Sequence, residues 1–345
     1  MVTNSSSTNL VIGLAAVGVG LVAAGVGLYR RRRAESASGG PQDDLQAEAG
    51  ARNEEQSPAG EIVDDRESLG NTPSHNSQKN PLLEYFGLVF ALTVPFWLFG
   101  NKPLPIPVKL PVSAMAWVNP LIAAVILTYR REGSTGVKEL FKRVLDFRKT
   151  KNKAWYLPVL FLSPLIAFLA YAVMRMSGLP LPDPQIPWLM VPAFFLAFFI
   201  GGIGEELGWM GYAFDPMQDR WGALKASVIL GLVWGIFHVI PDIQNGQTAD
   251  WILWQRLGTI GLRILMAWVY NNTGRSVFAA ILFHLTNNMS WALFPNYGSH
   301  YDPFVFGLII FLAAGIVITG WDSKTMTRYR FARLSGSASK DERAG

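Results

Sequence analysis

Long runs of apolar residues recur along most of this chain, and they constrain its fold more than any other feature. After residue 80 there are eight such runs, each close to the roughly 20 residues that a helix needs to span a bilayer. The chain is 50% hydrophobic and only 16% charged, well below the roughly 25% of charged residues in soluble domains. We therefore predict an all-α, polytopic membrane protein with an eight-helix core. The spans are expected at residues 82–100, 112–129, 155–174, 188–208, 226–240, 252–270, 277–294 and 304–321.

Two further segments precede this core. Residues 9–29 form an uncharged apolar run that Arg30 to Arg33 follow directly, which is the reverse of a cleaved secretory signal. We expect residues 1–33 to be a single transmembrane anchor, with its N-terminus outside and its arginines in the cytoplasm. Residues 34–80 are rich in Ser, Gly, Pro and acidic residues, and we expect them to form a disordered acidic linker.

Lys and Arg are concentrated in alternate connections between the runs. Because basic connections remain on the cytoplasmic side, this alternation predicts one orientation with a cytoplasmic C-terminus. The core is expected at residues 81–322, followed by a basic cytoplasmic tail at 323–345. The same placement argues against nucleic acid as a partner, although the formal net charge is +5. The basic connections are 130–153, 215–225, 271–275 and 322–343, whereas 101–111, 177–187, 241–250 and 295–303 carry few basic residues.

Five of the polar side chains within these apolar runs are candidate site residues. Glu205 and Glu206 are adjacent near the end of the fourth run, so their side chains point about 100° apart on a helix. His238 lies in the fifth run, and His284 and Asn288 share one face of the seventh. Charged side chains are costly in a membrane and usually mark functional sites. Their depths along the helices predict that the three motifs meet in a cavity that opens toward the cytoplasm.

These residue types support hydrolysis by two routes. In the first, one of the glutamates acts as a general base on water, with an imidazole beside it to orient the water. A second imidazole and an amide, His284 with Asn288, then donate hydrogen bonds to an oxyanion. In the second route, Glu205, His238 and His284 bind a zinc ion and leave a fourth position open. Both routes are open at this point, but the absence of cysteine excludes a thiolate metal site and a cysteine nucleophile.

The three motifs resemble those of a known family. They are Glu-Glu-Leu-Gly-Trp-x-Gly-Tyr from residue 205, an aromatic residue four positions before a histidine, and His-x-x-x-Asn from residue 284. Over residues 193–293 they look like the CPBP (Abi) family of intramembrane endopeptidases, which includes the CAAX prenyl-protein proteases and has an all-helical membrane fold.

The resemblance implies a role for each motif residue. Glu205 would be the catalytic base and act with His238. His284 and Asn288 would stabilise the oxyanion, and Glu206 belongs to the same catalytic set. A glutamate mechanism without a metal cofactor is implied, with a divalent ion such as zinc as the alternative. The substrate would be a peptide or protein, whether prenylated or held in the lipid bilayer.

Two positions depart from the family pattern. The first motif normally ends in an arginine four residues after Glu206, where this chain has Met210. Without that cation Glu206 needs another partner, such as Arg220 or Arg263, or must stay protonated. The second motif usually has phenylalanine where this chain has Trp234, and we expect this exchange to be harmless. We predict a CPBP-type endopeptidase; the alternatives are a catalytically silent relative that binds a membrane or lipidated partner and, less favoured, a transporter.

Overall fold

Eight helices of 17 to 24 residues account for most of the chain that the computed structural model describes, which is residues 81–103 and 111–330. No β-strand occurs within these two ranges. The predicted all-α fold is confirmed, and each predicted span overlaps one long helix, although the spans at 112–129 and 188–208 begin in short 3-10 helices. The predicted anchor (1–33), linker (34–80) and most of the tail lie outside the described residues. The helices are α2 (Pro81–Phe99), α3 (Asn119–Lys142), α4 (Tyr156–Met176), α5 (Val191–Gly208), α7 (Ala223–Gln244), α8 (Ala249–Asn272), α9 (Val277–Leu293) and α10 (Pro303–Gly320).

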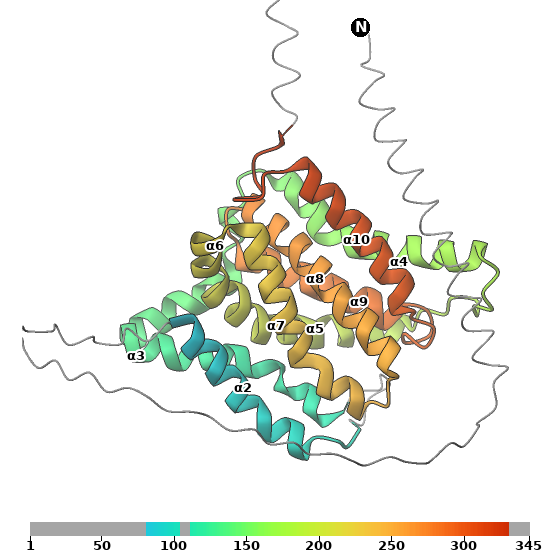
Figure 1. Ribbon diagram of the computed structural model, residues 1–345, viewed down its shortest axis with the longest axis horizontal. Helices are drawn as coiled ribbons and strands as arrows, with labels where there is room; N and C mark the ends of the chain where they lie inside the picture. Colours follow the sequence, from blue (N-terminus) through green and yellow to red (C-terminus); the bar gives the residue numbers. More distant parts are fainter. Residues whose placement is uncertain (1–80, 104–110, 331–345) are drawn as a thin grey trace, which may run out of the picture.

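The helices form one bundle in which α2 and α3 flank one side, and α4 and α10 the other (Figure 1). Six segments of the described chain are long and apolar enough to cross a membrane. Helices α8 and α9 are not among them, because α8 contains Asp250, Arg256 and Arg263 and α9 has only 17 residues. Both lie in the middle of the bundle, where α8 packs against α7, α9 and α10. Neighbouring helices, rather than lipid, therefore surround most of their polar side chains.

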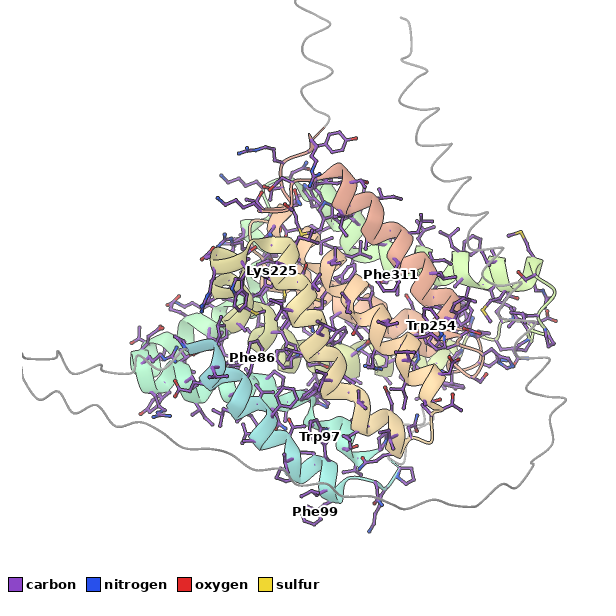
Figure 2. The ribbon with its side chains drawn as sticks, viewed as in Figure 1. Phe86, Trp97, Phe99, Lys225, Trp254 and Phe311 are labelled. Carbon is purple, nitrogen blue, oxygen red and sulfur yellow. The ribbon has the colours of Figure 1, made fainter. Side chains whose placement is uncertain are left out.

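Large apolar side chains cover the outside of the bundle (Figure 2). Leu98 and Phe99 at the end of α2 are 69% and 80% exposed, and Phe168 on α4 is 66% exposed. A soluble protein rarely exposes so much apolar surface. This surface is suited to contact with lipid.

Glycines allow the second half of α5 to approach α3 and the short helix before it, η1 (Val112–Val118). A Cβ atom added at Gly204 would overlap the indole ring of Trp117. One added at Gly208 would overlap the main chain of Pro120. The Gly-rich sequence therefore permits a close contact between helices, as small residues do in membrane proteins, and this contact fixes the position of both glutamates.

Helix α5 continues without a break into a π-helix, η6 (Trp209–Phe214), and then into α6 (Asp215–Trp221). A π-helical turn leaves main-chain carbonyl groups without their usual helical partner, and such turns are frequent at functional sites. Here the Arg143 guanidinium donates to the carbonyl oxygen of Gly211. The irregular turn follows the glutamates by three residues, so it lies beside the site.

The start of α9 is fixed by a carboxylate from another part of the chain. Asp146 accepts hydrogen bonds from the hydroxyl of Ser276 at 2.7 Å and from the main-chain N–H of Phe278 at 3.1 Å. A negative charge at a helix N-terminus satisfies its free N–H groups and complements the helix dipole. This cap sets the rotation of α9 and with it the direction of His284, two turns further along.

Candidate active site

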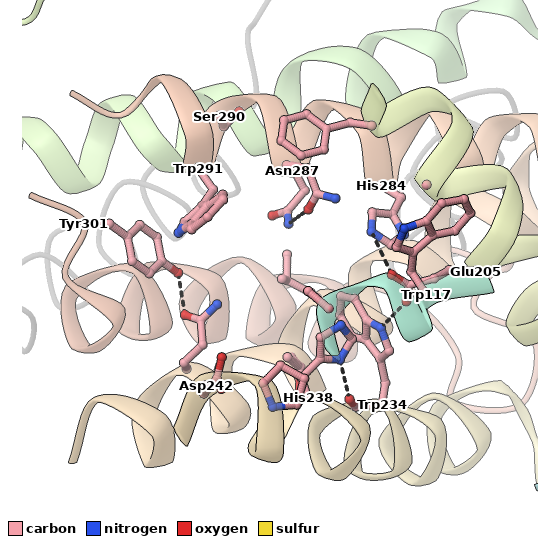
Figure 3. A pocket seen from close by; sticks show the side chains of 18 of the residues that line it. Trp117, Glu205, Trp234, His238, Asp242, His284, Asn287, Ser290, Trp291 and Tyr301 are labelled. Atoms are coloured by element: carbon pink, nitrogen blue, oxygen red, sulfur yellow. Dashed lines mark hydrogen bonds and ion pairs between the residues drawn. The ribbon is translucent and has the colours of Figure 1, made fainter. Parts of the chain in front are cut away.

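The three sequence motifs meet at one cavity of about 450 Å³ between α5, α7, α8 and α9 (Figure 3). Glutamate, histidine and asparagine side chains from three helices face it, although they are up to 83 positions apart in the sequence numbering (205 and 288). The predicted meeting of the motifs agrees with this geometry. The candidate residues that line the cavity are Glu205, His238, His284 and Asn288, whereas Glu206 lies behind its wall.

Glu206 is fully buried, and both of its carboxylate oxygens are occupied. Its Oε1 accepts a hydrogen bond from His284 Nδ1 at 2.7 Å, and its Oε2 accepts one from Arg263 Nη1 at 2.6 Å. The side chains of Glu206 and Arg263 are both 0% exposed. Arg263, one of the two predicted candidates, therefore supplies the cation that Met210 cannot. It reaches Glu206 from α8 instead of from the next turn of the same chain segment.

Glu205 is held through one oxygen only. Its Oε2 accepts hydrogen bonds from the indole N–H groups of Trp234 at 2.6 Å and Trp209 at 3.2 Å. Its Oε1 faces Nε2 of His284 at 3.9 Å and has no hydrogen bond to another described residue. The two indoles thus fix the carboxylate, while Oε1 stays available to a molecule in the cavity.

The two tryptophans are contacts of Glu205 that the sequence analysis did not predict. We expected the phenylalanine-to-tryptophan exchange at residue 234 to be harmless, and we interpreted Trp209 as a packing or interface residue. An indole N–H is a hydrogen-bond donor that phenylalanine lacks. The Arg263 guanidinium also lies 4.1 Å from the centre of the Trp234 ring. Trp234 therefore connects the partner of Glu206 to Glu205.

His238 reaches the cavity from α7. Its Nδ1 lies 2.8 Å from the carbonyl oxygen of Trp234. Because a carbonyl oxygen can only accept, Nδ1 must carry the hydrogen in this contact. The other ring nitrogen, Nε2, is then left with a lone pair that can accept a hydrogen bond from a substrate.

Two neighbouring asparagines on α9 line the cavity. We expected Asn288 there, but we assigned no role to Asn287, which also lines it. The Asn287 amide donates to Asn288 Oδ1 over a long distance of 3.5 Å. Residues 284, 287, 288 and 291 lie at helical spacing and share one face, so the spacing from His284 was the signal that identifies Asn287.

The described carboxylate and imidazole groups fit a metal ion poorly. Within the described ranges one such cluster occurs, Glu205 with Glu206 and His284, whose donor atoms lie within 4.8 Å of one another. His238, which we had included in the zinc set, is not a member of it. Both oxygens of Glu206 are engaged, so Glu205 Oε1 and His284 Nε2 are the donors that remain. Catalytic zinc uses three protein ligands, and the Arg263 cation lies close by.

The cavity extends away from the basic connections, and this corrects our expectation that it opens toward them. Toward the basic end the lining stops before the π-helix, where Trp209, Met210 and Phe214 are fully buried. Toward the other end it is lined by partly exposed residues in the connections that follow α7 and α9. These residues include Asn245, Gln247 and Tyr301.

Comparisons with known proteins agree with this arrangement. Residues 186–290 match the protein family described as type II CAAX prenyl endopeptidase Rce1-like. A CAAX prenyl protease 2 from Methanococcus maripaludis is 24% identical over 233 residues, which cover 62% of this chain and 84% of that relative. The family match contains all the motif residues described above. The predicted resemblance to the CPBP and CAAX protease family is confirmed, and it supports a CAAX-protease-like intramembrane endopeptidase.

Proposed function

This chain is a polytopic membrane protein with the motifs of the CPBP family of intramembrane endopeptidases, and we propose that it hydrolyses a peptide bond with a water molecule that Glu205 activates. One observation carries the proposal. The Oε2 atom of Glu205 is held by two indole N–H groups, whereas its Oε1 faces the cavity beside His284. A general base must be fixed in place and must keep one oxygen free for the proton that it takes.

The nucleophilic water would lie between Glu205 and His284. The separation of 3.9 Å between Glu205 Oε1 and His284 Nε2 is short enough for one water molecule to contact both. Glu205 would take a proton from the water while the water oxygen bonds to the substrate carbonyl carbon. It would return this proton to the departing amine nitrogen when the C–N bond breaks.

His238 and Asn288 would act on the substrate from the same cavity. The Asn288 amide can donate to the oxyanion that forms on the carbonyl oxygen, an interaction that is strongest in a site sheltered from water. His238 Nε2 can accept a hydrogen bond from a substrate N–H. This assignment differs from the one that the resemblance implies, because His284 rather than His238 is the imidazole next to Glu205.

Glu206 and Arg263 would act as positioning residues in this mechanism. Glu206 holds Nδ1 of His284, and Arg263 holds Glu206, so the ring orientation is set through a buried ion pair. The absence of an arginine at Met210 was the reason to consider a catalytically silent relative. Since Arg263 provides the positive charge, this geometry favours an active enzyme that needs no metal ion.

The first test compares peptide cleavage by purified wild type, Glu205→Gln and Glu139→Gln in detergent. A panel of prenylated and unmodified peptides serves as substrate, and folding is checked by thermal unfolding. General bases contribute about 100-fold or more to rate, so we expect Glu205→Gln to lose at least that much. Glu139→Gln, on the surface of α3, is the matched control and should cleave like wild type.

Wild-type rates in folded Glu205→Gln would contradict the role of Glu205. If wild type binds a peptide of the panel but cleaves none, the silent alternative holds. A chelator added to the same assay is expected to leave the rate unchanged. Loss of activity on chelation, restored by zinc, would instead support the metal route.

A further inference from the structure

Basic side chains gather at one end of the bundle. The described segments between α3 and α4, between α5 and α7, and between α8 and α9, together with the segment after α10, all lie at this end (Figure 1). Lys225 in Figure 2 marks it at the start of α7. The basic residues of these four segments are Arg143, Arg148, Lys149, Lys151, Lys153, Arg220, Arg275, Lys324, Arg328 and Arg330.

The opposite end carries less positive charge, although Arg175 lies there in the last turn of α4. The connections α4–α5 (177–190), α7–α8 (245–248) and α9–α10 (294–302) contain no Lys or Arg. Lys102 is the one basic residue in the described part of the α2–α3 connection. Because short basic connections are retained in the cytoplasm, this second end faces away from it.

The cavity belongs to the end with less positive charge. On α7 its lining begins at Trp234 and continues to the end of the helix, whereas on α8 it stops at Leu262. On α9 it begins at His284 and continues to Trp291. Helices α7 and α9 start at the basic end and α8 finishes there, so all three helices contribute only their far halves.

The lining of the cavity near its mouth is partly polar and partly apolar. An ion pair between Asp242 and Arg256, 2.9 Å apart, belongs to the polar part, and both side chains are largely buried. Phe194 and Phe198 from α5 are apolar residues of the same lining. An extended peptide presents main-chain hydrogen-bonding groups and alternating side chains, which suit such a lining.

We infer that the cavity takes its substrate from the non-cytoplasmic side of the membrane, as an extended peptide segment of an exported or membrane-anchored protein. The inference rests on the proposed peptidase function for the identity of the reaction. The direction of access rests only on the charge distribution and on the extent of the cavity. A cytoplasmic peptide would meet the end at which the buried residues of the π-helix lie.

The chain contains no cysteine, so single cysteines can report the orientation directly. Asp183→Cys lies in the α4–α5 connection, where Asp183 is 91% exposed, and Gln247→Cys lies at the cavity mouth. Lys324→Cys, also at an exposed position, is the matched variant for the basic end. Each is expressed in the full chain, and cells are treated with a membrane-impermeant maleimide before or after permeabilisation.

We expect Asp183→Cys and Gln247→Cys to react fully in intact cells, and Lys324→Cys to react only after permeabilisation. The reverse pattern would overturn the inference. Labelling does not depend on cleavage. If the reverse labelling pattern is found in a protein whose peptidase activity depends on Glu205, the side of access is wrong and the proposed peptidase function stands. The labelling could also follow the expected pattern while folded Glu205→Gln is fully active. That result would reject the proposed role of Glu205 in peptide hydrolysis but would support the non-cytoplasmic orientation of the cavity.

Discussion

Arg263 supports both glutamates of the site, Glu206 directly and Glu205 through Trp234. Its guanidinium donates to Glu206 and lies on the ring of Trp234, whose N–H group holds Glu205. Removing one partner of a buried ion pair leaves the other charge without compensation, which costs about 3–5 kcal/mol. A single arginine on α8 thus supports the arrangement of residues on α5 and α7.

We predict that Arg263→Met loses cleavage activity and about 3–5 kcal/mol of unfolding free energy. In the double variant Arg263→Met/Met210→Arg, the positive charge returns to a position one turn from Glu206, and part of the activity should recover. Cleavage rates and denaturant unfolding in detergent measure both effects. Arg275→Met, a half-exposed arginine, is the control and should change little.

Recovery in the double variant depends on the charge rather than on packing. A double variant that is folded but no more active than Arg263→Met would contradict the proposal that Arg263 acts by neutralising Glu206. Stability close to wild type in Arg263→Met would contradict the buried ion pair itself.

At the scale of an element, α5 is the helix whose packing determines the site. It carries both glutamates, approaches α3 through its glycines and continues into the π-helix beyond one end of the cavity. A shift of α5 would move Glu205 relative to His284 on α9. Because proteins pack as tightly as organic crystals, even one added methyl group forces such a shift.

We predict that Gly208→Ala lowers both stability and activity. The added Cβ would overlap the Pro120 main chain and lie 2.5 Å from the Tyr85 hydroxyl, and overpacking of this kind costs about 1–3 kcal/mol. Gly87→Ala on α2 is the matched control, since no atom lies within 4 Å of its added Cβ. Thermal unfolding and cleavage rates should separate the two, and equal behaviour would show that α5 and α3 are not in close contact.

At the scale of the whole molecule, the turn after α10 joins three helices at the basic end. The carbonyl oxygens of Ser323 and Lys324 accept the first N–H groups of α7. Side chains at the end of α8 bind the carbonyls of Thr325 and Met326. Asp322 holds the turn itself, since it accepts hydrogen bonds from main-chain N–H groups within it.

The stability of this turn should depend on pH. Partial burial of Asp322 opposes its ionisation, but hydrogen bonds from the N–H groups of Thr325, Arg328 and Lys324 outweigh this and lower its pKa to about 2. An unfolded aspartate has a pKa of about 3.9. The carboxylate therefore stabilises the turn above about pH 4, and this contribution is lost as the pH falls toward about 2.

We predict that limited proteolysis after α10 becomes faster in wild type as the pH falls from about 4 toward 2. An acid-stable protease is required for the measurement. Asp322→Asn should be cleaved faster than wild type at neutral pH and should show no further change over this range. A wild-type protein whose cleavage is independent of pH would refute the role of Asp322.

The sequence alone determined the eight core helices and the residues that carry the site. Apolar runs of membrane length form helices wherever they pack, because lipid leaves main-chain groups no other partners. Costly polar residues in such runs, Glu205, His238, His284 and Asn288, had to share a protein-lined space. Both arguments depend on short segments and on the solvent, so they needed no tertiary structure.

Only the tertiary structure decided how these residues are connected and where the cavity leads. The partner of Glu206, the indole donors to Glu205 and the place of Asn287 depend on how α5, α7, α8 and α9 are rotated about their axes. The direction of the cavity depends on the buried side chains of the π-helix, before which the lining stops. The rotation of the helices and the extent of the cavity result from contacts between segments far apart in the chain, for which a local sequence pattern carries no signal.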